Sequence, residues 1–190
     1  MAALVKRGLH VAPFKVGPDF IDPGHHTRVT GIISRNLDGW MLSQEDNLQC
    51  YYHHTRKADI AVVEGVMGVF DGYDGKSEAG STAQMAKWLH LPVILVVDAR
   101  STARSAAALV SGFEKFDRNL DDAGVLFNHV GSGRHLQYLK EALEGHVDMP
   151  CLGGVKRDQD VSIPERHLGL VTTQDYILSD TSIARLAALI

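Results

Sequence analysis

Short apolar segments alternate with longer amphipathic segments along most of this 190-residue chain. Short runs rich in Val, Ile and Leu are typical of buried strands, whereas the segments between them have the length of helices. This alternation favours an α/β fold, in which a mostly parallel sheet carries helices on both faces. Residues 92–97 are almost wholly apolar, which fits a strand buried on both faces. We expect strands over 9–14, 58–63, 92–97, 123–127 and 151–155.

Helices are expected between these strands and at both ends of the chain. Residues 1–7 have helical character, and Gly8 suits the position that follows a helix. In a doubly wound fold such a helix follows a strand and a phosphate-binding loop, so we expect both to lie outside this chain. The other expected helices cover 43–55, 81–89, 101–116, 134–144 and 181–190. The helix over 181–190 ends on apolar residues, which suggests a partner domain or a homodimer contact.

Composition places the chain among soluble globular domains. It is 45% apolar and 22% charged, and it shows no repeat or linker, so we expect one domain over 1–190. The net charge of −4 and the lack of a Lys/Arg stripe argue against nucleic acid as a partner. No apolar run reaches the roughly 18–20 residues that cross a bilayer. Cys50 and Cys151 give no disulfide or metal framework, so the reducing cytoplasm is the expected location.

Opposite charges are concentrated on a loop that follows the first expected strand. Residues 15–26 read Lys-Val-Gly-Pro-Asp-Phe-Ile-Asp-Pro-Gly-His-His. Open α/β sheets bind ligands at the carboxyl ends of their strands, and Gly and Pro fix the path of this loop. Lys15 is suited to neutralising a phosphate, while Asp19 and Asp22 are hard oxygen donors suited to Mg²⁺. The alternative is a solvated loop whose charges pair with one another.

Polar side chains also follow the later strands. Glu64 ends an apolar strand and precedes a glycine. P-loop enzymes use an acid at this position to hold Mg²⁺ or its bound water. The alternative is that Glu64 is only a turn residue. Ser81 begins a helix whose N–H groups suit an anion, or it only caps that helix. Asp98 either caps the helix that begins near residue 101, which is the better match, or orients a partner residue near the nucleotide. Asn128 closes a strand, where it reads an adenine edge or forms a turn.

The chain contains ten histidines, two adjacent pairs among them, His25-His26 and His53-His54. Zinc sites on helices place histidines four residues apart, which an adjacent pair does not do. We therefore expect solvated or capping side chains at these positions.

These segments, taken in order, resemble the amino-terminal nucleotide-binding domain of the cobyrinic acid a,c-diamide synthase family. The residues at 13–26 and 64–72 are the most specific part of the resemblance. The related cobyric acid synthase family lacks a Gly-Pro-Asp-x-x-Asp-Pro-Gly loop, so the a,c-diamide branch is the better match. The resemblance covers nearly the whole chain, through 13–26, 34–41, 64–72, 80–83, 96–100, 128–132 and 164–170.

The resemblance implies a P-loop fold similar to dethiobiotin synthetase, and it implies an activity. Such enzymes use ATP and Mg²⁺ to phosphorylate carboxylates of a corrin ring. Ammonia released from glutamine by a carboxyl-terminal glutaminase domain then forms the amides. On this resemblance, Lys15 holds the transferred phosphoryl group, Asp19 and Glu64 hold Mg²⁺, and Asp22 acts near the substrate carboxylate.

The resemblance also assigns Ser81, Asn128 and Arg157 to the nucleotide, with Asn128 beside the adenine. Family members open with a Gly-Lys-Thr/Ser loop and end with a glutaminase domain, and neither is present in these 190 residues. The chain alone is therefore expected to bind ATP weakly and not to amidate with glutamine. Lys156 stands where relatives usually have proline before Arg157. Two rival functions are nickel-sirohydrochlorin a,c-diamide synthase and a non-catalytic interaction module on the same fold.

Overall fold

A computed structural model describes residues 1–158, 165–166, 169–170 and 179–189. The chain forms two compact units. The first unit comprises Met1–Leu89 and the described residues within Asp160–Ala188. The second unit comprises residues 90–158 and Leu189. Among the described residues, no helix is both long and apolar enough to cross a lipid bilayer.

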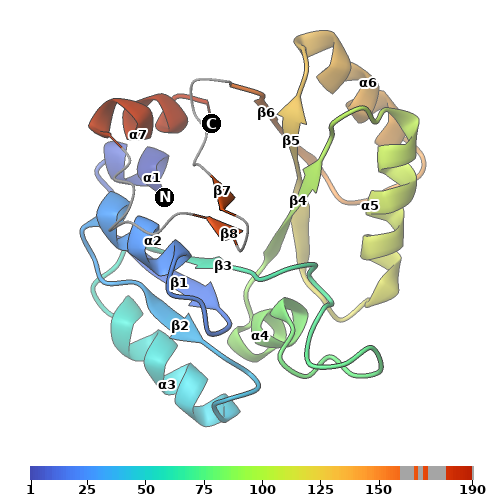
Figure 1. Cartoon of the computed structure of the whole chain (residues 1–190). Helices are drawn as coiled ribbons and strands as arrows, with labels where there is room; N and C mark the ends of the chain where they lie inside the picture. The colour runs from blue at the N-terminus through green and yellow to red at the C-terminus, as the bar shows by residue number, and fades with distance from the viewer. Residues whose placement is uncertain (159–164, 167–168, 171–178, 190) are drawn as a thin grey trace. The chain divides into compact units, whose positions relative to one another are not determined.

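The first unit is built on a three-stranded parallel sheet. Strand β1 (Val11–Val16) lies between β2 (Arg35–Leu37) and β3 (Ile60–Glu64). Helices lie on both faces of this sheet (Figure 1). Helices α1 (Ala2–Lys6), α2 (Asp22–Thr30) and α7 (Asp180–Ala187) lie on one side, and α3 (Gln44–Thr55) and α4 (Thr82–Leu89) lie on the other. The described residues near the carboxyl end also include a short antiparallel pair, β7 (Glu165–Arg166) and β8 (Gly169–Leu170).

The central position of β1 explains its composition. Every residue of this strand is buried, because neighbouring strands cover its edges and helices cover its faces. The Phe14 ring is fully buried and contacts Tyr51 of α3, with the ring centroids 5.2 Å apart. Helix α3 begins with a capping box between Ser43 and Asp46. The predicted helix over 43–55 is therefore confirmed, with Ser43 as its cap.

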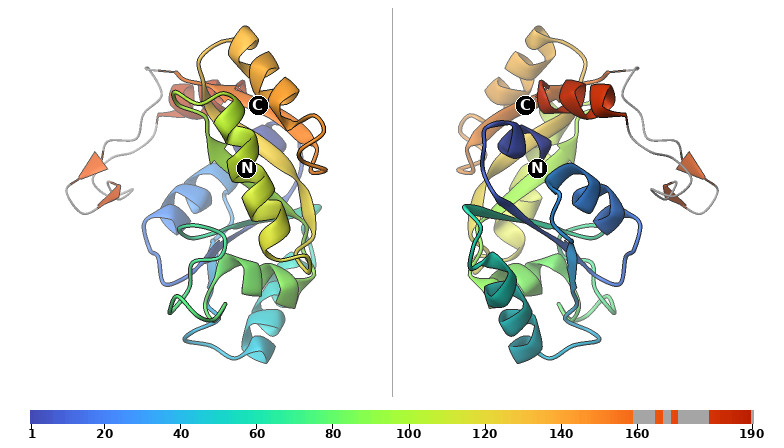
Figure 2. Two further views of the ribbon diagram at one scale, coloured as in Figure 1. Left: turned by 90° about the vertical axis from the view of Figure 1, so that its right-hand side faces the viewer. Right: turned by 90° about the vertical axis from the view of Figure 1, so that its left-hand side faces the viewer.

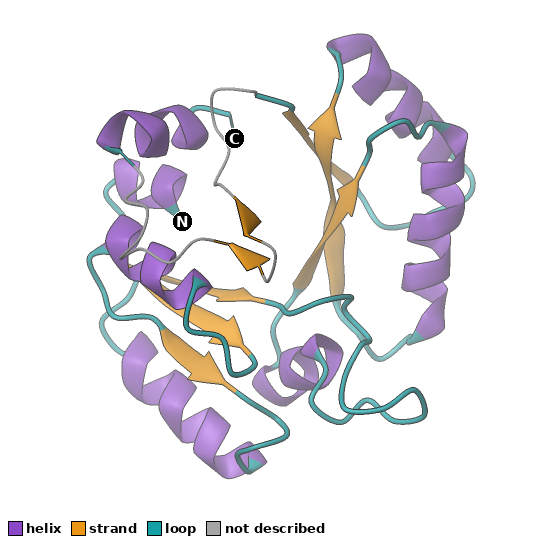
Figure 3. Ribbon diagram, viewed as in Figure 1, coloured by secondary structure: helices purple, strands orange, loops and turns teal. Residues whose placement is uncertain are grey.

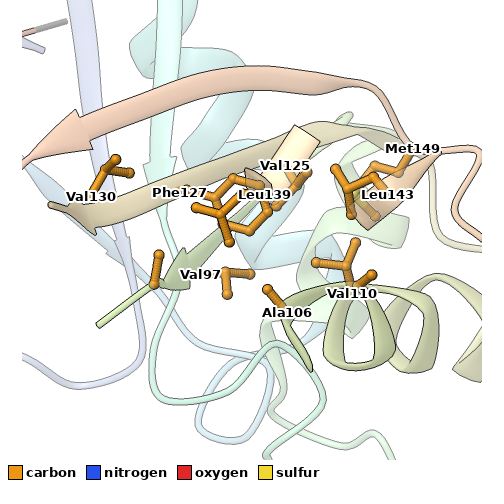
Figure 4. Packing of buried hydrophobic residues seen from close by; sticks show 11 residues of the cluster. Val97, Ala106, Val110, Val125, Phe127, Val130, Leu139, Leu143 and Met149 are labelled. Carbon is orange, nitrogen blue, oxygen red and sulfur yellow. The ribbon is translucent and has the colours of Figure 1, made fainter. Parts of the chain in front are cut away.

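The second unit is also built on a three-stranded parallel sheet, with the order β4–β5–β6. Its strands are β4 (Val93–Asp98), β5 (Asp122–Val130) and β6 (Cys151–Lys156). Helices α5 (Arg104–Phe116) and α6 (Gly133–Leu143) lie side by side on one face of this sheet (Figures 2 and 3). Between the helices and the sheet lies an apolar core (Figure 4). Its members include Val97, Val110, Val125, Phe127, Leu139 and Leu143.

The expectation that residues 92–97 form a strand buried on both faces is wrong. Val97 is in the core, but Ile94 and Val96 on the opposite face of β4 are 54% and 60% exposed. An unbroken apolar run indicates a strand without saying how many of its faces are covered. Here both described helices of the second unit lie on the same face of its sheet, so neither of them covers the other face of β4.

The five predicted strands and all of the predicted helices are present, with ends displaced by at most three residues. Helix α2 and strand β2 were not expected. Helix α2 begins with Asp22-Pro23-Gly24, a sequence that resembles a turn, although Pro suits the first turn of a helix. Strand β2 has only three residues, too few for a periodic signal. Helix α5 begins at Arg104 and not near residue 101, because Ser101 has a left-handed backbone (φ 54°).

We predict that the core beneath α5 and α6 contributes most of the stability of the second unit. Leu139→Ala removes a fully buried side chain and should lower the free energy of unfolding by about 2–5 kcal/mol. Leu109→Ala, the same change at a half-exposed position of α5, should cost about 1 kcal/mol or less. Urea unfolding followed by circular dichroism measures both values, and equal losses would contradict the assigned core.

Candidate functional site

The predicted site residue Lys15 lies within strand β1, so the expectation that it lies on a loop is wrong. It is the fifth residue of the strand and is only 4% exposed. In the sheet register it lies beside Asn36 of β2 and Glu64 of β3. Three polar residues thus occupy one row near the carboxyl edge of the sheet, which is where parallel sheets place their ligands.

The ammonium group of Lys15 is surrounded by oxygen atoms from several elements. Its Nζ is 2.7 Å from the Asp22 carboxylate, 3.4 Å from that of Glu64 and 3.9 Å from that of Asp19. It also donates a hydrogen bond of 2.9 Å to the carbonyl oxygen of Gly65. We call Lys15, Asp19, Asp22 and Glu64 the charged cluster. The structure therefore brings together the four residues that the sequence predicted to be catalytic.

Contacts within the charged cluster favour the ionised forms of Lys15 and Glu64. Burial disfavours the Lys15 ammonium, but the Asp22 hydrogen bond and the charges of Glu64 and Asp22 outweigh it and raise the pKa of Lys15. Burial likewise disfavours the Glu64 carboxylate. His26 and Lys15 outweigh this effect and lower the pKa of Glu64. At neutral pH Lys15 is a cation and Glu64 is an anion.

His26 is a site residue that sequence reasoning missed, and the expectation of solvated histidines is wrong at positions 25 and 26. Both side chains are buried. Nε2 of His26 contacts the Glu64 carboxylate, and its Nδ1 lies 3.2 Å from the Ser34 hydroxyl. His26 lies four residues after Asp22 on helix α2, the spacing that puts two side chains on one helical face. This spacing would have revealed it if the helix had been expected.

The turn between β1 and α2 is held by two side chains. The Asn36 amide donates hydrogen bonds of 2.8 and 2.6 Å to the carbonyl oxygens of Gly17 and Asp19. Oδ1 of Asp19 accepts hydrogen bonds from the N–H groups of Ile21, at 2.7 Å, and Asp22, at 3.4 Å. One carboxylate oxygen of Asp19 therefore caps the start of α2, and the other faces Lys15.

Ser81 lies in the first unit at the start of helix α4. It is buried, and its hydroxyl accepts a hydrogen bond of 3.1 Å from the N–H of Gln84. Ser81 thus caps the helix, and its assignment to an anion stays a prediction. The next residue, Thr82, accepts a hydrogen bond of 3.0 Å from the Val66 N–H. This contact ties α4 to the segment that follows Glu64.

The remaining predicted residues lie in the second unit. Asn128 does not close its strand, because β5 continues to Val130, and its Oδ1 accepts a hydrogen bond of 2.9 Å from the His129 N–H. Arg157 follows β6, and its N–H donates to the Val130 carbonyl at 3.2 Å. The nucleotide roles of Asn128 and Arg157 stay predictions. Asp98 does not cap α5. It binds the Arg100 guanidinium and lies 3.1 Å from Nδ1 of His129.

The chemistry of the charged cluster fits a divalent cation. Its three carboxylates exceed the single ammonium by two negative charges. Mg²⁺ prefers one or two carboxylates together with phosphate oxygens, so a complete set of protein ligands is not required. In the described part of the chain, no three His, Cys, Asp or Glu side chains converge as a metal site. The assignment of Asp19 and Glu64 to Mg²⁺ stays a prediction.

The fold and the cluster define a class of nucleotide-binding α/β proteins, and comparison with known sequences gives the family. The profile of the CobQ/CobB/MinD/ParA nucleotide-binding domain matches residues 1–171. The chain belongs to this family, whose fold is that of the P-loop NTPases. The predicted fold class is confirmed.

Individual relatives carry more specific names. Cobyrinate a,c-diamide synthase of Methanosarcina acetivorans is 49% identical over 174 residues, 90% of this chain and 35% of the relative. The Synechococcus protein of the same name is 48% identical over all 190 residues, 41% of its length. Hydrogenobyrinate a,c-diamide synthase of Streptomyces coelicolor is 52% identical over 171 residues, 90% of this chain and 35% of the relative. The chain thus spans 35% to 41% of the length of these relatives.

The lowered pKa of Glu64 predicts a pH-dependent contribution to stability. A group with a lowered pKa stabilises the fold above its ordinary pKa, here 4.5, and this contribution is lost as the pH falls through the lowered value. Glu64→Gln should therefore cost most stability at neutral pH and progressively less below pH 4.5. The side chain is nearly half exposed, so solvent screening limits the neutral-pH cost to about 1 kcal/mol.

Urea titrations at several pH values test this prediction. Glu144→Gln, at an exposed glutamate, is the matched control. A Glu64→Gln cost that stays constant from pH 7 to pH 3 would contradict the assigned ion pairs.

Proposed function

We propose that this chain is the nucleotide-binding part of an enzyme that amidates the a and c carboxylates of a tetrapyrrole, cobyrinic acid or a close analogue, using ATP. The observation that carries the proposal is a buried lysine among three carboxylates at the carboxyl edge of a parallel sheet. It occurs in a chain that is 48% to 52% identical to relatives named for this activity on cobyrinate or hydrogenobyrinate.

The proposed reaction has two steps. A carboxylate oxygen of the tetrapyrrole attacks the γ-phosphorus of ATP, the bond to the bridging oxygen breaks, and ADP leaves with an acyl phosphate formed on the substrate. Ammonia then attacks the acyl carbon, phosphate leaves, and loss of a proton gives the amide. Phosphoryl transfer depends mainly on positioning and on neutralising charge. The charged cluster has the composition that this step requires.

Each member of the charged cluster has a distinct role in this proposal. The Lys15 ammonium neutralises the transferred phosphoryl group, because its raised pKa keeps it charged. Asp19 and Glu64 would hold Mg²⁺, which supplies charge neutralisation of phosphate oxygens when it is bound. Asp22 orients Lys15 through the 2.7 Å ion pair near the substrate carboxylate. His26 is a positioning residue, because it fixes the orientation of the Glu64 carboxylate.

The ammonia source and the remaining nucleotide contacts complete the proposal. We assign ammonia release from glutamine to a glutaminase domain outside these 190 residues, and the phosphate-binding loop to a segment that is also outside them. Ser81, Asn128 and Arg157 would contact the nucleotide. The enzyme would act in the cytoplasm.

Substitutions in the charged cluster should reduce activity without unfolding the protein. In the complete polypeptide that contains this chain, Asp19→Asn and Glu64→Gln should each lower kcat/KM by about 10²-fold or more, as expected for the loss of a preorganised charge. Asp59→Asn is the matched control, because Asp59 is an exposed carboxylate paired with His10. ATP-dependent amidation of cobyrinic acid with glutamine, and with free ammonia, measures the effect.

Three outcomes of this assay separate the candidate functions. Full activity in both variants contradicts the metal assignment. Faster turnover of nickel-sirohydrochlorin than of cobyrinic acid identifies the rival substrate. A complete polypeptide that amidates neither tetrapyrrole would be a non-catalytic module.

A further inference from the structure

Large apolar side chains are exposed on the segments that follow the strands of the first sheet. Three segments of the first unit continue from the carboxyl ends of β1, β2 and β3, namely residues 17–21, 38–43 and 65–81. Soluble proteins rarely leave several large apolar side chains exposed on adjoining loops without a binding role. We call these five side chains the apolar rim: Phe20 (77% exposed), Trp40 (58%), Met41 (68%), Met67 (76%) and Tyr73 (62%).

Two members of the apolar rim form a preorganised flat surface. The rings of Trp40 and Tyr73 stack with their centroids 3.7 Å apart and their planes only 9° from parallel. The backbone of each is fixed. Oδ1 of Asp38 accepts a hydrogen bond of 2.8 Å from the Trp40 N–H, and the Tyr73 N–H donates to the Ala79 carbonyl at 2.8 Å. Both rings remain more than half exposed, so their outer surfaces are available to another flat molecule.

The loops of the apolar rim are joined to the charged cluster. The carbonyl of Gly65 accepts the Lys15 hydrogen bond, and Met67 follows two residues later with a left-handed backbone (φ 50°). The Val66 side chain packs against Gly17, at 3.7 Å from the position of a Cβ there. A non-glycine residue held in this backbone region costs free energy, and such strain gathers at functional sites. The loops after β1 and β3 therefore act as one surface.

The net charge of the charged cluster determines how much of the substrate affinity must come from the apolar rim. Without a bound cation, the cluster has two more negative than positive charges, so it would repel a substrate that carries several carboxylates. Affinity for such a substrate must therefore come from contacts away from the reacting carboxylate. Stacked aromatic faces bind flat rings, and methionines adapt to irregular apolar shapes.

We propose that the apolar rim is the binding surface for the tetrapyrrole macrocycle, with the Trp40–Tyr73 stack beneath the ring and the reacting carboxylate directed toward Lys15. This inference rests on the proposed function. It assigns substrate affinity to the rim and phosphoryl transfer to the charged cluster. A purine base is the alternative occupant, and the test distinguishes it from the macrocycle.

The test uses the complete polypeptide that contains this chain, with cobyrinic acid as the ligand. Trp40→Ala and Tyr73→Ala should each raise the Kd for cobyrinic acid, and its KM, by about tenfold or more, as for removal of other stacking side chains. The KM for ATP should change by less than about twofold, because the proposal assigns the rim to the tetrapyrrole and not to the nucleotide. Tyr52→Ala, at an exposed tyrosine of helix α3 outside the rim and the charged cluster, is the matched control and should behave as wild type.

Binding is measured without ATP, by quenching of tryptophan fluorescence for the tyrosine variants and by equilibrium dialysis for all proteins. An unchanged Kd for cobyrinic acid in Trp40→Ala and Tyr73→Ala overturns the rim proposal and leaves the proposed function intact. A raised KM for ATP with unchanged cobyrinic acid binding also overturns the rim proposal, and it would make the rim a nucleotide-binding surface. A wild-type protein that does not bind cobyrinic acid contradicts the proposed function and the rim together.

Discussion

The ammonium group of Lys15 is buried on the central strand of the first unit, where an unpaired charge would be strongly unfavourable. Its partners come from three places: Asp19 from the turn after β1, Asp22 from the start of α2, and Glu64 from the end of β3. A single buried cation thus holds a turn, a helix and a strand in one arrangement. Loss of one partner of a buried pair is costly because the other charge remains behind. The same requirement that stabilises the local fold keeps the charges of the site in position.

The contacts of Glu64 extend the charged cluster to two further residues, His26 and Ser34. Lys15 approaches one carboxylate oxygen at 3.4 Å, and His26 contacts the other. The imidazole is fixed in turn by the Ser34 hydroxyl, 3.2 Å from its Nδ1. The carboxylate therefore has little rotational freedom, and its lowered pKa follows from these two neighbours. A carboxylate oriented in this way needs little reorganisation when charge develops beside it, which is the condition for electrostatic catalysis.

The sequence was sufficient to predict the alternating architecture and the charged cluster, because apolar runs mark strands and strand ends mark ligand sites. It was not sufficient for α2, which begins with residues typical of turns, or for β2, which is too short to show a period. His26 was missed for the same reason, since its approach to Glu64 depends on that helix. The open face of β4 was missed because Ile94 and Val96 read as buried whether or not a helix covers them. The local sequence shows the hydrophobic period of a strand. Whether a helix covers a given face of that strand depends on where helices distant in the sequence pack.

The cap that Asp19 provides to α2 has a consequence for how an anion enters this site. The N–H groups of Ile21 and Asp22, which a helix start would offer to a phosphate, are already bound by the chain's own carboxylate. Lys15 is likewise bound by Asp22. In the proposed reaction, a phosphoryl group that entered this site would compete with these carboxylates, so the site would act as an ion exchanger. Such an exchange would favour an anion that fits the existing arrangement of donors over one that does not.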